Sequence, residues 1–253
     1  MKISVITVCR NSQATIAYTI ESFLLQDYAD KELVVVDGVS TDRTLAIVET
    51  FKSDLIRVKS EPDRGIYDAM NKGLGRYQGD AVGFLHSDDT FHDAHALDRL
   101  AEGLATADVV FGDLQMVEDH QAKTAVRTWE PGGFSRIGVH LGWVPPHPTF
   151  YARRKVFDAF GVFNTKYTIA ADYEFMLWAL MKHRCSWRYI PATLVDFQIG
   201  GTSTRGFKAS LTANLECLDV RRRLFGWVPV DLAFFGRPIR RLNQLNWRRP
   251  VPS

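Results

Sequence analysis

The chain has 253 residues, enough for one large domain or two small ones with a sizeable core. Hydrophobic residues make up 46% and charged residues 24%, an ordinary globular composition that argues against intrinsic disorder and against a multi-span membrane protein. The formal net charge of +2 is too small to indicate a nucleic-acid partner, and three cysteines without a C-x-x-C pair favour a reducing cytoplasm.

Predicted strands and helices alternate through the first third of the sequence. Apolar runs at 3–8 and 33–36 are typical of strands buried on both faces, and the segment between them, 12–25, has helical spacing. These three elements form a β-α-β unit, which should be right-handed. The next expected elements are a helix that begins at the N-cap Ser40-Thr41-Asp42, a strand at 56–58, a helix at 66–74 and a strand at 81–85.

The remainder is less regular and contains no internal repeat. We expect a strand near 109–111, an irregular Gly/Pro-rich segment at 131–148, a helix over 172–181 and a strand around 187–190. This order of elements predicts an α/β fold with a mainly parallel, mixed sheet flanked by helices.

Carboxylates follow the predicted strands. Asp37 ends the second strand, and Asp88-Asp89 comes after the strand at 81–85. Ligands of open α/β sheets bind outside the carboxyl ends of the strands, so these acids should converge on one crevice. Mg²⁺ or Mn²⁺ needs only one or two carboxylates there, together with the phosphates of a nucleotide. Turn formation is the simpler explanation of each acidic segment taken alone.

Two other nucleotide-binding motifs are absent. Cys9-Arg10-Asn11-Ser12 stands where a dinucleotide-binding fold carries G-x-G-x-x-G, and no G-x-x-x-x-G-K-[ST] occurs in the sequence. The sequence therefore argues against a dehydrogenase and against a P-loop NTPase.

Several short motifs follow one another in a specific order over roughly residues 1–205. They are SVITVCRNS, ELVVVDGVSTDRT, SEPDRGIYDAMNKG, GFLHSDD, HPTFYARR, AADYEF and GGTS. Together they resemble family 2 glycosyltransferases with the Rossmann-like GT-A fold, and within that family the bacterial polysaccharide and glycolipid biosynthesis group. The resemblance implies a hexosyltransferase-type enzyme that uses a nucleotide-sugar, with a UDP-sugar favoured, and Mn²⁺ or Mg²⁺.

The resemblance also implies a metal ligand and a donor-binding set. Asp89, the last acid of Ser87-Asp88-Asp89, corresponds to the metal ligand of the family's D-x-D-type site. The residues implied to contact the base, ribose, sugar or diphosphate of the donor are Thr7, Asp37, Arg64, Asn71 and Asp88.

By the same resemblance, Asp172, in AADYEF, corresponds to the catalytic base of the family. Displacement of a nucleoside diphosphate from an anomeric carbon needs a base near the attacking hydroxyl and charge neutralisation at the leaving group. A single base on the face opposite the leaving group implies inversion. Ala171 departs from the acid that many relatives carry before this aspartate, and without the resemblance an N-cap role for Asp172 would be the simpler interpretation.

Other residues are candidates for the acceptor side. His147, between two prolines, is a candidate for the acceptor pocket, although His147 and His86 could equally be structural. Gly201 and Ser203 belong to a GGTS segment that is either a plain turn or a lid that contacts the diphosphate. Trp143 could stack on a sugar or lipid or pack in the core.

The C-terminal segment 217–253 is electrostatically separate from the rest. It holds eight arginines and two aspartates, a net +6, which leaves −4 for residues 1–216 because the total is +2. Arginines flank an apolar run too short to span a bilayer, a pattern typical of an interfacial segment on an anionic membrane. A basic face folded back on the catalytic domain, or an oligomer contact, would have the same composition.

We therefore predict a catalytic domain over 1–216, with a nucleotide-sugar half to about residue 110 and an acceptor half over 111–216, followed by a basic amphipathic segment. The predicted enzyme is inverting and metal-dependent, acts on a lipid-linked glycan acceptor and lies on the inner face of the cell membrane. Two other functions remain open, a metal-dependent nucleotidyltransferase, which needs no base at Asp172, and a non-catalytic glycan- or nucleotide-binding module, which needs none of the acids.

Overall fold

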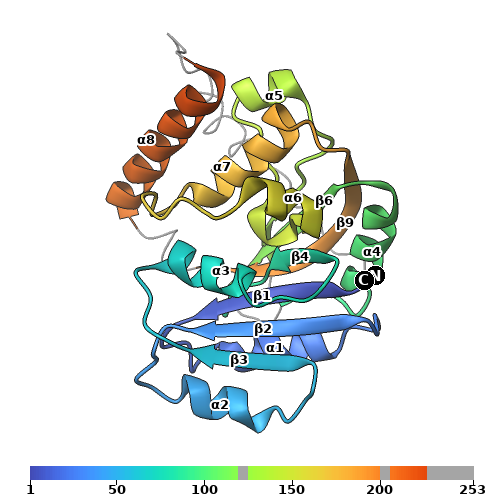
Figure 1. Ribbon diagram of the computed structural model, residues 1–253, viewed down its shortest axis with the longest axis vertical. Coiled ribbons are helices and arrows are strands. Elements are labelled where there is room, and N and C mark those ends of the chain that lie inside the picture. Colours follow the sequence, from blue (N-terminus) through green and yellow to red (C-terminus); the bar gives the residue numbers. More distant parts are fainter. Residues whose placement is uncertain (119–124, 200–205, 227–253) are drawn as a thin grey trace.

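The computed structural model describes residues 1–118, 125–199 and 206–226, and within them nine strands form one sheet with helices on both faces (Figure 1). The strands are β1 (Ile3–Cys9), β2 (Lys31–Asp37), β3 (Ile56–Ser60), β4 (Ala81–Phe84), β5 (Asp89–Phe91), β6 (Val109–Val117), β7 (Ala125–Trp129), β8 (Tyr151–Arg153) and β9 (Trp187–Gln198). Their order across the sheet is β3-β2-β1-β4-β8-β6-β9-β5, with β7 paired to β6.

The helices lie between these strands and after the last of them. They are α1 (Ile16–Leu24), α2 (Thr44–Thr50), α3 (Ile66–Leu74), α4 (Ala96–Thr106), α5 (Arg136–His140), α6 (Arg154–Phe160), α7 (Ala171–Leu177) and α8 (Gly206–Phe225). A 3₁₀ turn, η1 (His147–Thr149), precedes β8, and a π-helical turn, η2 (Trp178–Lys182), extends α7.

Each face of the sheet has its own hydrophobic core, which explains the unbroken valine run of β2. Val34 and Val36 pack in the core that contains residues of α3, α6 and α7, whereas Leu33 and Val35 pack in the core that contains residues of α1 and α4. Because successive strand residues point to opposite faces, a strand covered on both sides must be apolar throughout.

The predicted α/β fold and mixed sheet are confirmed, but parallel pairing dominates only the first half of the chain. In the described residues, β1 pairs in parallel with β2 and β4, β2 with β3, and β6 with β9. The pairs β4–β8, β5–β9, β6–β7 and β6–β8 are antiparallel. The second half therefore follows a different plan from the β-α-β units that the sequence pattern revealed.

Several predicted boundaries need correction. The Gly/Pro-rich segment 131–148 is not wholly irregular, because it contains α5 and the start of η1. The helix predicted over 172–181 is α-helical only to Leu177. The helix expected to be capped by Ser40-Thr41-Asp42 begins at Thr44 with Arg43 as N-cap, although an Asp42 carboxylate oxygen still accepts a hydrogen bond from the Thr44 backbone N–H at 2.9 Å.

Helix α8 runs across the predicted division between residues 216 and 217. Cys217 and Val220 are buried in the same core as α7, so this part of the basic segment packs on the rest of the protein. Residues 227–253, which hold most of the predicted interfacial segment, lie outside the description. None of the described helices is both long and apolar enough to cross a bilayer.

Candidate active site

The candidate residues gather at the carboxyl ends of the parallel strands, which point to the same side in Figure 1. In the register of the sheet, Cys9 at the end of β1 lies opposite Asp37 at the end of β2. Beyond β4, the Leu85 backbone N–H still bonds to the Ile6 carbonyl at 3.0 Å, and the chain then turns into Asp88. Asp37 and Asp88 thus follow strands that end at the same edge of the sheet, and their convergence on one crevice stays a prediction.

Asp37 is fully buried and held by its neighbours. Its carboxylate accepts hydrogen bonds from the Ser40 backbone N–H at 3.0 Å and from the Ser60 hydroxyl at 2.7 Å. The Cys9 thiol lies 3.8 Å from the same carboxylate, and burial together with this negative charge raises the pKa of Cys9 to about 12. Cys9 is therefore an inert neutral thiol, and the position of Asp37 is fixed by β1, β2 and β3 together.

Side chains from the loops after β1 and β3 lie close to Gly38, in the loop after β2. A Cβ atom at this position would lie 2.2 Å from a carboxylate oxygen of Asp63, so a larger residue would displace the Asp63 side chain. The next residue, Val39, has φ of 57°, a strained value for a β-branched residue, and strain of this kind gathers at functional sites. The Asn11 side chain accepts a hydrogen bond from the Thr41 backbone N–H at 2.9 Å.

The other predicted donor contacts take different positions. The Thr7 hydroxyl donates to the Leu85 carbonyl at 2.6 Å and ties β1 to the end of β4. The Asn71 amide donates to the Phe163 carbonyl at 2.9 Å and accepts from its backbone N–H at 2.7 Å. The Arg64 side chain is 84% exposed and lies 3.4 Å from a carboxylate oxygen of Asp68. The described contacts of Thr7 and Asn71 are structural, and the donor roles of all three remain predictions.

Asp89 is an unusual buried acid. It is 0% exposed, and neither carboxylate oxygen has a hydrogen bond of ordinary geometry to the described residues. Burial and the negative charge of Asp88 raise the pKa of Asp89 well above its usual range, and the backbone at Gln198 offsets this only in part. A divalent cation would supply the missing partner, since it binds carboxylate oxygens and favours the ionised form.

No group of three or more His, Cys, Asp or Glu side chains in the described parts of the chain could hold a metal ion without other ligands. A cation bound to a nucleotide needs fewer protein ligands, because the phosphates supply the others. Asp89 therefore fits the role of a single protein ligand.

Two histidine rings make a contact between the two halves of the chain close to Asp88-Asp89 in the sequence. The rings of His86, after β4, and His147, in η1, stack with centroids 5.7 Å apart, and Phe84 stacks on His147 at 5.6 Å. Burial, followed by the neighbouring His147 imidazole, lowers the pKa of His86 to about 3, and burial also lowers the pKa of His147. Both rings are therefore neutral at physiological pH, and the His86 Nδ1 and His147 Nε2 atoms are buried without a hydrogen-bond partner in the described structure.

Asp172 lies next to this histidine pair, in the first turn of α7. One carboxylate oxygen accepts a hydrogen bond from the Tyr67 hydroxyl at 2.8 Å, and the other lies 3.8 Å from His147 Nδ1. The N-cap of α7 is Ala170, and no side chain caps it, so the N-cap interpretation of Asp172 is wrong. The structure thus places a partly exposed carboxylate beside His147, whose ring stacks on His86 at the end of β4.

Some residues were missed or fall outside the description. Tyr67 was not predicted, because its partner lies 105 residues away and only the fold brings the two together. Trp143 is 3% exposed and donates its indole N–H to the Pro131 carbonyl at 2.7 Å, so it packs in the core. Gly201 and Ser203 lie outside the described residues.

Comparison with known proteins identifies the family. Residues 4–161, more than half of the chain, match Glycosyl transferase family 2. A PGL/p-HBAD biosynthesis glycosyltransferase of Mycobacterium bovis is 30% identical over 207 residues, covering 79% of this chain and 78% of the relative. An uncharacterised glycosyltransferase of Mycobacterium tuberculosis is 29% identical over 250 residues, covering 97% of this chain and 94% of the relative. The chain belongs to glycosyl transferase family 2 and is a glycosyltransferase.

Solved structures support the same fold. S. aureus TarS 1-349 in complex with UDP-GlcNAc matches with a TM-score of 0.67 and 22% identity. The match covers 88% of this chain and 65% of the TarS chain. The mannosyltransferase PcManGT from Pyrobaculum calidifontis, in complex with GDP-Man and Mn²⁺, matches with a TM-score of 0.61 and 18% identity over 95% of this chain and 80% of its own. The fold is therefore that of the GT-A glycosyltransferases.

Proposed function

We propose that the protein transfers a sugar from a nucleotide-sugar donor to an acceptor hydroxyl, with inversion at the anomeric carbon. The observation that carries the proposal is the placement of Asp172, which lies 3.8 Å from His147. The His147 ring stacks on His86, which precedes Asp88-Asp89 in the sequence. This placement supports a single site in which an acid for the acceptor and acids for the donor would come from opposite halves of the chain.

The donor side rests on the ends of β1, β2 and β4. Asp37, fixed by Ser40 and Ser60, would bind the base and ribose beside Thr7, and the partly exposed Asp88 would bind the ribose. Arg64 is exposed next to Asp63, whose side chain lies against Gly38, and its guanidinium would exchange Asp68 for a diphosphate. We favour a UDP-sugar, since relatives of this fold include TarS in complex with UDP-GlcNAc.

Asp89 would hold a Mn²⁺ or Mg²⁺ ion bound with the donor. Its buried carboxylate lacks partners among the described residues, and structures of the same fold include complexes with Mn²⁺. A bound divalent cation supplies charge neutralisation for the departing diphosphate.

Asp172 would act as the general base. Its carboxylate accepts the proton of the acceptor hydroxyl while the hydroxyl oxygen forms a bond to the anomeric carbon. The bond from that carbon to the phosphate oxygen breaks, and its electron pair leaves with the nucleoside diphosphate. Tyr67 donates to one carboxylate oxygen and leaves the other, which faces His147, for the proton.

For the acceptor we propose a lipid-linked glycan, with His147, Gly201 and Ser203 on the acceptor side. A relative that is 30% identical acts in PGL/p-HBAD biosynthesis, which supports a glycolipid product. We further propose that residues 227–253 bind the anionic inner face of the cell membrane. Five arginines and one aspartate give this stretch a net +4, interleaved with Trp and Phe.

A donor screen tests the proposal. Purified protein is incubated with UDP-, GDP- and dTDP-sugars with and without Mn²⁺, and release of the nucleoside diphosphate is measured. We expect one nucleotide class to be hydrolysed in Mn²⁺ and not in EDTA. Pyrophosphate release from a nucleoside triphosphate and a sugar phosphate would instead indicate a nucleotidyltransferase, and nucleotide binding without any release would indicate a non-catalytic module.

A further inference from the structure

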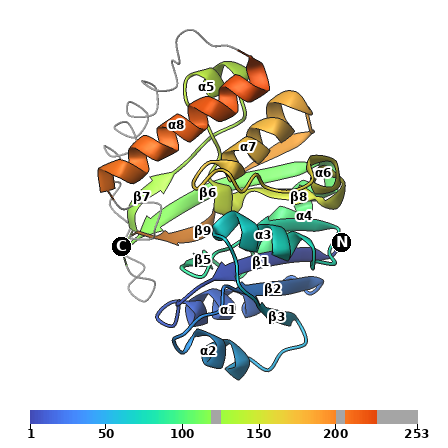
Figure 2. The ribbon, with the colours of Figure 1, turned by 60° about the vertical axis from the view of Figure 1, so that its left-hand side comes forward.

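Helix α8 lies along α7, the helix that carries Asp172 (Figures 1 and 2). Glu216, Asp219, Val220 and Arg223 are spaced i, i+3, i+4 and i+7, which places them on one face of α8. Val220 is 0% exposed, and the other three side chains hydrogen-bond to residues between 167 and 174. This face of α8 therefore packs on the segment that contains Asp172.

Glu216 binds the backbone immediately before Asp172. One carboxylate oxygen accepts hydrogen bonds from the Thr168 backbone N–H at 2.9 Å and from the Thr168 hydroxyl at 2.7 Å. The other oxygen accepts from the Ile169 N–H at 2.8 Å and from the Ala170 N–H at 3.0 Å. A single side chain thus uses both oxygens to hold three consecutive amides.

This arrangement fixes the turn that leads into α7. The backbone N–H groups at a helix start need acceptors, and the N-cap residue of α7 is Ala170, which has no side-chain acceptor to offer. Glu216 supplies the acceptors for the preceding turn from a helix 46 residues further along the chain. Its hydrogen bonds are charge-assisted, and such bonds are about twice as strong as neutral ones.

A second set of contacts holds the residues immediately after Asp172. Arg221 is 4% exposed and donates to the Tyr173 hydroxyl at 3.0 Å. Arg223 donates to a carboxylate oxygen of Glu174 at 3.1 Å. Helix α8 therefore fixes the chain on both sides of Asp172, while the Asp172 carboxylate itself faces Tyr67 and His147.

We propose that Glu216 is a positioning residue for the catalytic base. In this role it acts through the backbone before Asp172 and needs no contact with substrate. It fixes the turn before α7, and with it the direction in which the Asp172 carboxylate points toward the acceptor hydroxyl. Misplacement of a reacting group by about 1 Å can cost about 100-fold in rate, so a clamp on this turn matters for catalysis. This inference rests on the proposed role of Asp172 as the base.

Glu216→Gln tests the inference with little change in size. The amide keeps one acceptor oxygen but presents an NH₂ group to backbone donors, so one half of the clamp is lost. With the donor found by the screen, we expect kcat to fall about tenfold and the donor KM to stay within twofold. Glu102→Gln, which neutralises an exposed acid on α4, is the matched control and should leave both unchanged. An unchanged kcat in Glu216→Gln, or a loss equal to the loss of folded protein by circular dichroism, would overturn the proposal.

A double variant separates this inference from the proposed function. If Glu216 acts through Asp172, Glu216→Gln should cause no further loss in an Asp172→Asn background, whereas two independent losses would multiply. A fully active Asp172→Asn variant would contradict the proposed function itself. An impaired Asp172→Asn variant together with a normal Glu216→Gln variant would contradict only the role of Glu216.

Thr168 provides a milder test in case Glu216→Gln does not fold. Thr168→Val removes the hydroxyl that donates to Glu216, and Thr168→Ser keeps it. We expect a two- to threefold fall in kcat for the valine variant, with an unchanged donor KM, and recovery in the serine variant. Equal activity of the two variants would count against the clamp.

Discussion

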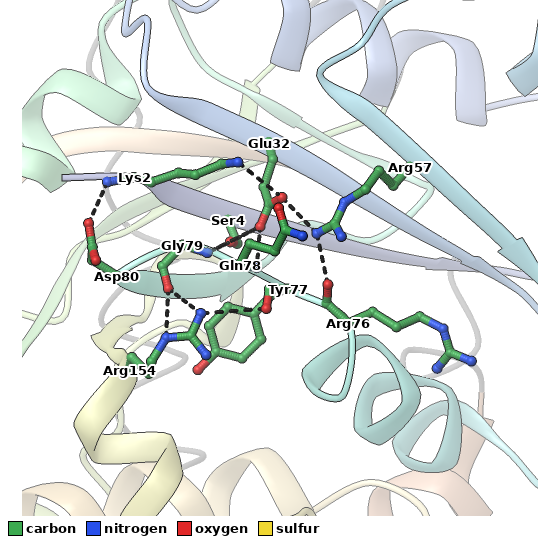
Figure 3. A network of polar contacts seen from close by, with 10 residues as sticks. All are labelled: Lys2, Ser4, Glu32, Arg57, Arg76, Tyr77, Gln78, Gly79, Asp80 and Arg154. Atoms are coloured by element: carbon green, nitrogen blue, oxygen red, sulfur yellow. Dashed lines mark hydrogen bonds and ion pairs between the residues drawn. The ribbon is translucent and has the colours of Figure 1, made fainter.

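The buried carboxyl groups at the two ends of the parallel strands have opposite electrostatic surroundings. At the amino ends of β1, β2 and β4, Glu32 is 3% exposed and fully surrounded by donors (Figure 3). Arg57 lies 2.7 Å from one of its oxygens, and the other accepts hydrogen bonds from the Ser4 hydroxyl and the Gln78 backbone N–H at 2.5 Å each. These partners outweigh burial and lower the pKa of Glu32.

At the carboxyl ends, Asp89 is just as deeply buried but lacks such partners in the described residues. Its pKa is raised rather than lowered, because burial and Asp88 act against ionisation. Nearby, His86 and His147 each have a buried ring nitrogen with no described hydrogen-bond partner.

The difference shows how one sheet serves both stability and function. A buried charge with a full set of partners stabilises the fold, and removing one partner is costly. A buried charge without partners costs stability and is retained where a ligand later supplies them. We therefore assign the Glu32 network to folding and the Asp89 and histidine cluster to binding, and the predictions below test that assignment.

The largest effect is expected for Asp172→Asn. If Asp172 accepts the acceptor proton, turnover should fall by about 10²–10⁴, the range typical of a lost general base, while donor affinity stays nearly unchanged. Initial-rate kinetics and isothermal titration with the donor measure the two quantities separately. Turnover close to that of the wild type would exclude Asp172 as the base.

Asp89→Asn should separate binding from stability. In Mn²⁺, donor affinity should fall about tenfold or more, whereas in EDTA the variant and the wild type should bind equally weakly. In metal-free buffer the variant should unfold at the same temperature as the wild type or higher, because neither carboxyl oxygen has a hydrogen bond of ordinary geometry to lose among the described residues. Equal losses of affinity with and without metal would contradict a ligand role.

Glu32→Gln should show the reverse behaviour. Loss of the ion pairs with Arg57 and Lys2 should lower the free energy of unfolding by about 1–3 kcal/mol, since charged donors lose their acceptor. Donor affinity should not change, because the network lies at the other end of the strands. A large loss of donor affinity without a loss of stability would break the comparison between the two ends.

The same variant gives a pH test with a defined sign. The pKa of Glu32 is lower in the folded protein than its ordinary value of 4.5, so the folded state binds this proton less tightly than the unfolded state. The stabilisation is therefore present above about pH 4.5 and is lost as the pH falls through the folded pKa. Urea unfolding should show a wild-type advantage over Glu32→Gln that is constant near neutrality and shrinks in acid.

The sequence predicted the first half of the fold well and the second half poorly, for a physical reason. Strands β1, β2 and β4 and helix α3 are regular elements with complete local patterns, and the predicted helix 66–74 matches α3. Strands β5 and β8 have three residues each, too few to show a period, and they form only because distant strands pair with them.

The candidate site, too, could be predicted from the sequence only in part. Acids at strand ends could be placed from topology alone, as Asp37 and Asp89 were. The surroundings of Asp172 could not, because Tyr67, His147 and Glu216 are brought to it from three separate elements and no local pattern announces such contacts. Roles that depend on long-range hydrogen bonds need the structure.

The smallest effect is expected for Tyr67→Phe. The Tyr67 ring is buried against Phe163, with ring centroids 5.9 Å apart, so phenylalanine should preserve the packing. It removes the hydroxyl that donates to the Asp172 carboxylate and that also interacts with the backbone of Ala171 and Asp172. A carboxylate that loses this donor is less well oriented toward the acceptor hydroxyl. We expect kcat to fall about three- to tenfold with an unchanged donor KM. Tyr28→Phe, which removes a hydroxyl remote from the site, is the control. If Tyr67→Phe leaves kcat unchanged, the hydrogen bond plays no part in catalysis, and Tyr67 serves stability, as the Glu32 network does.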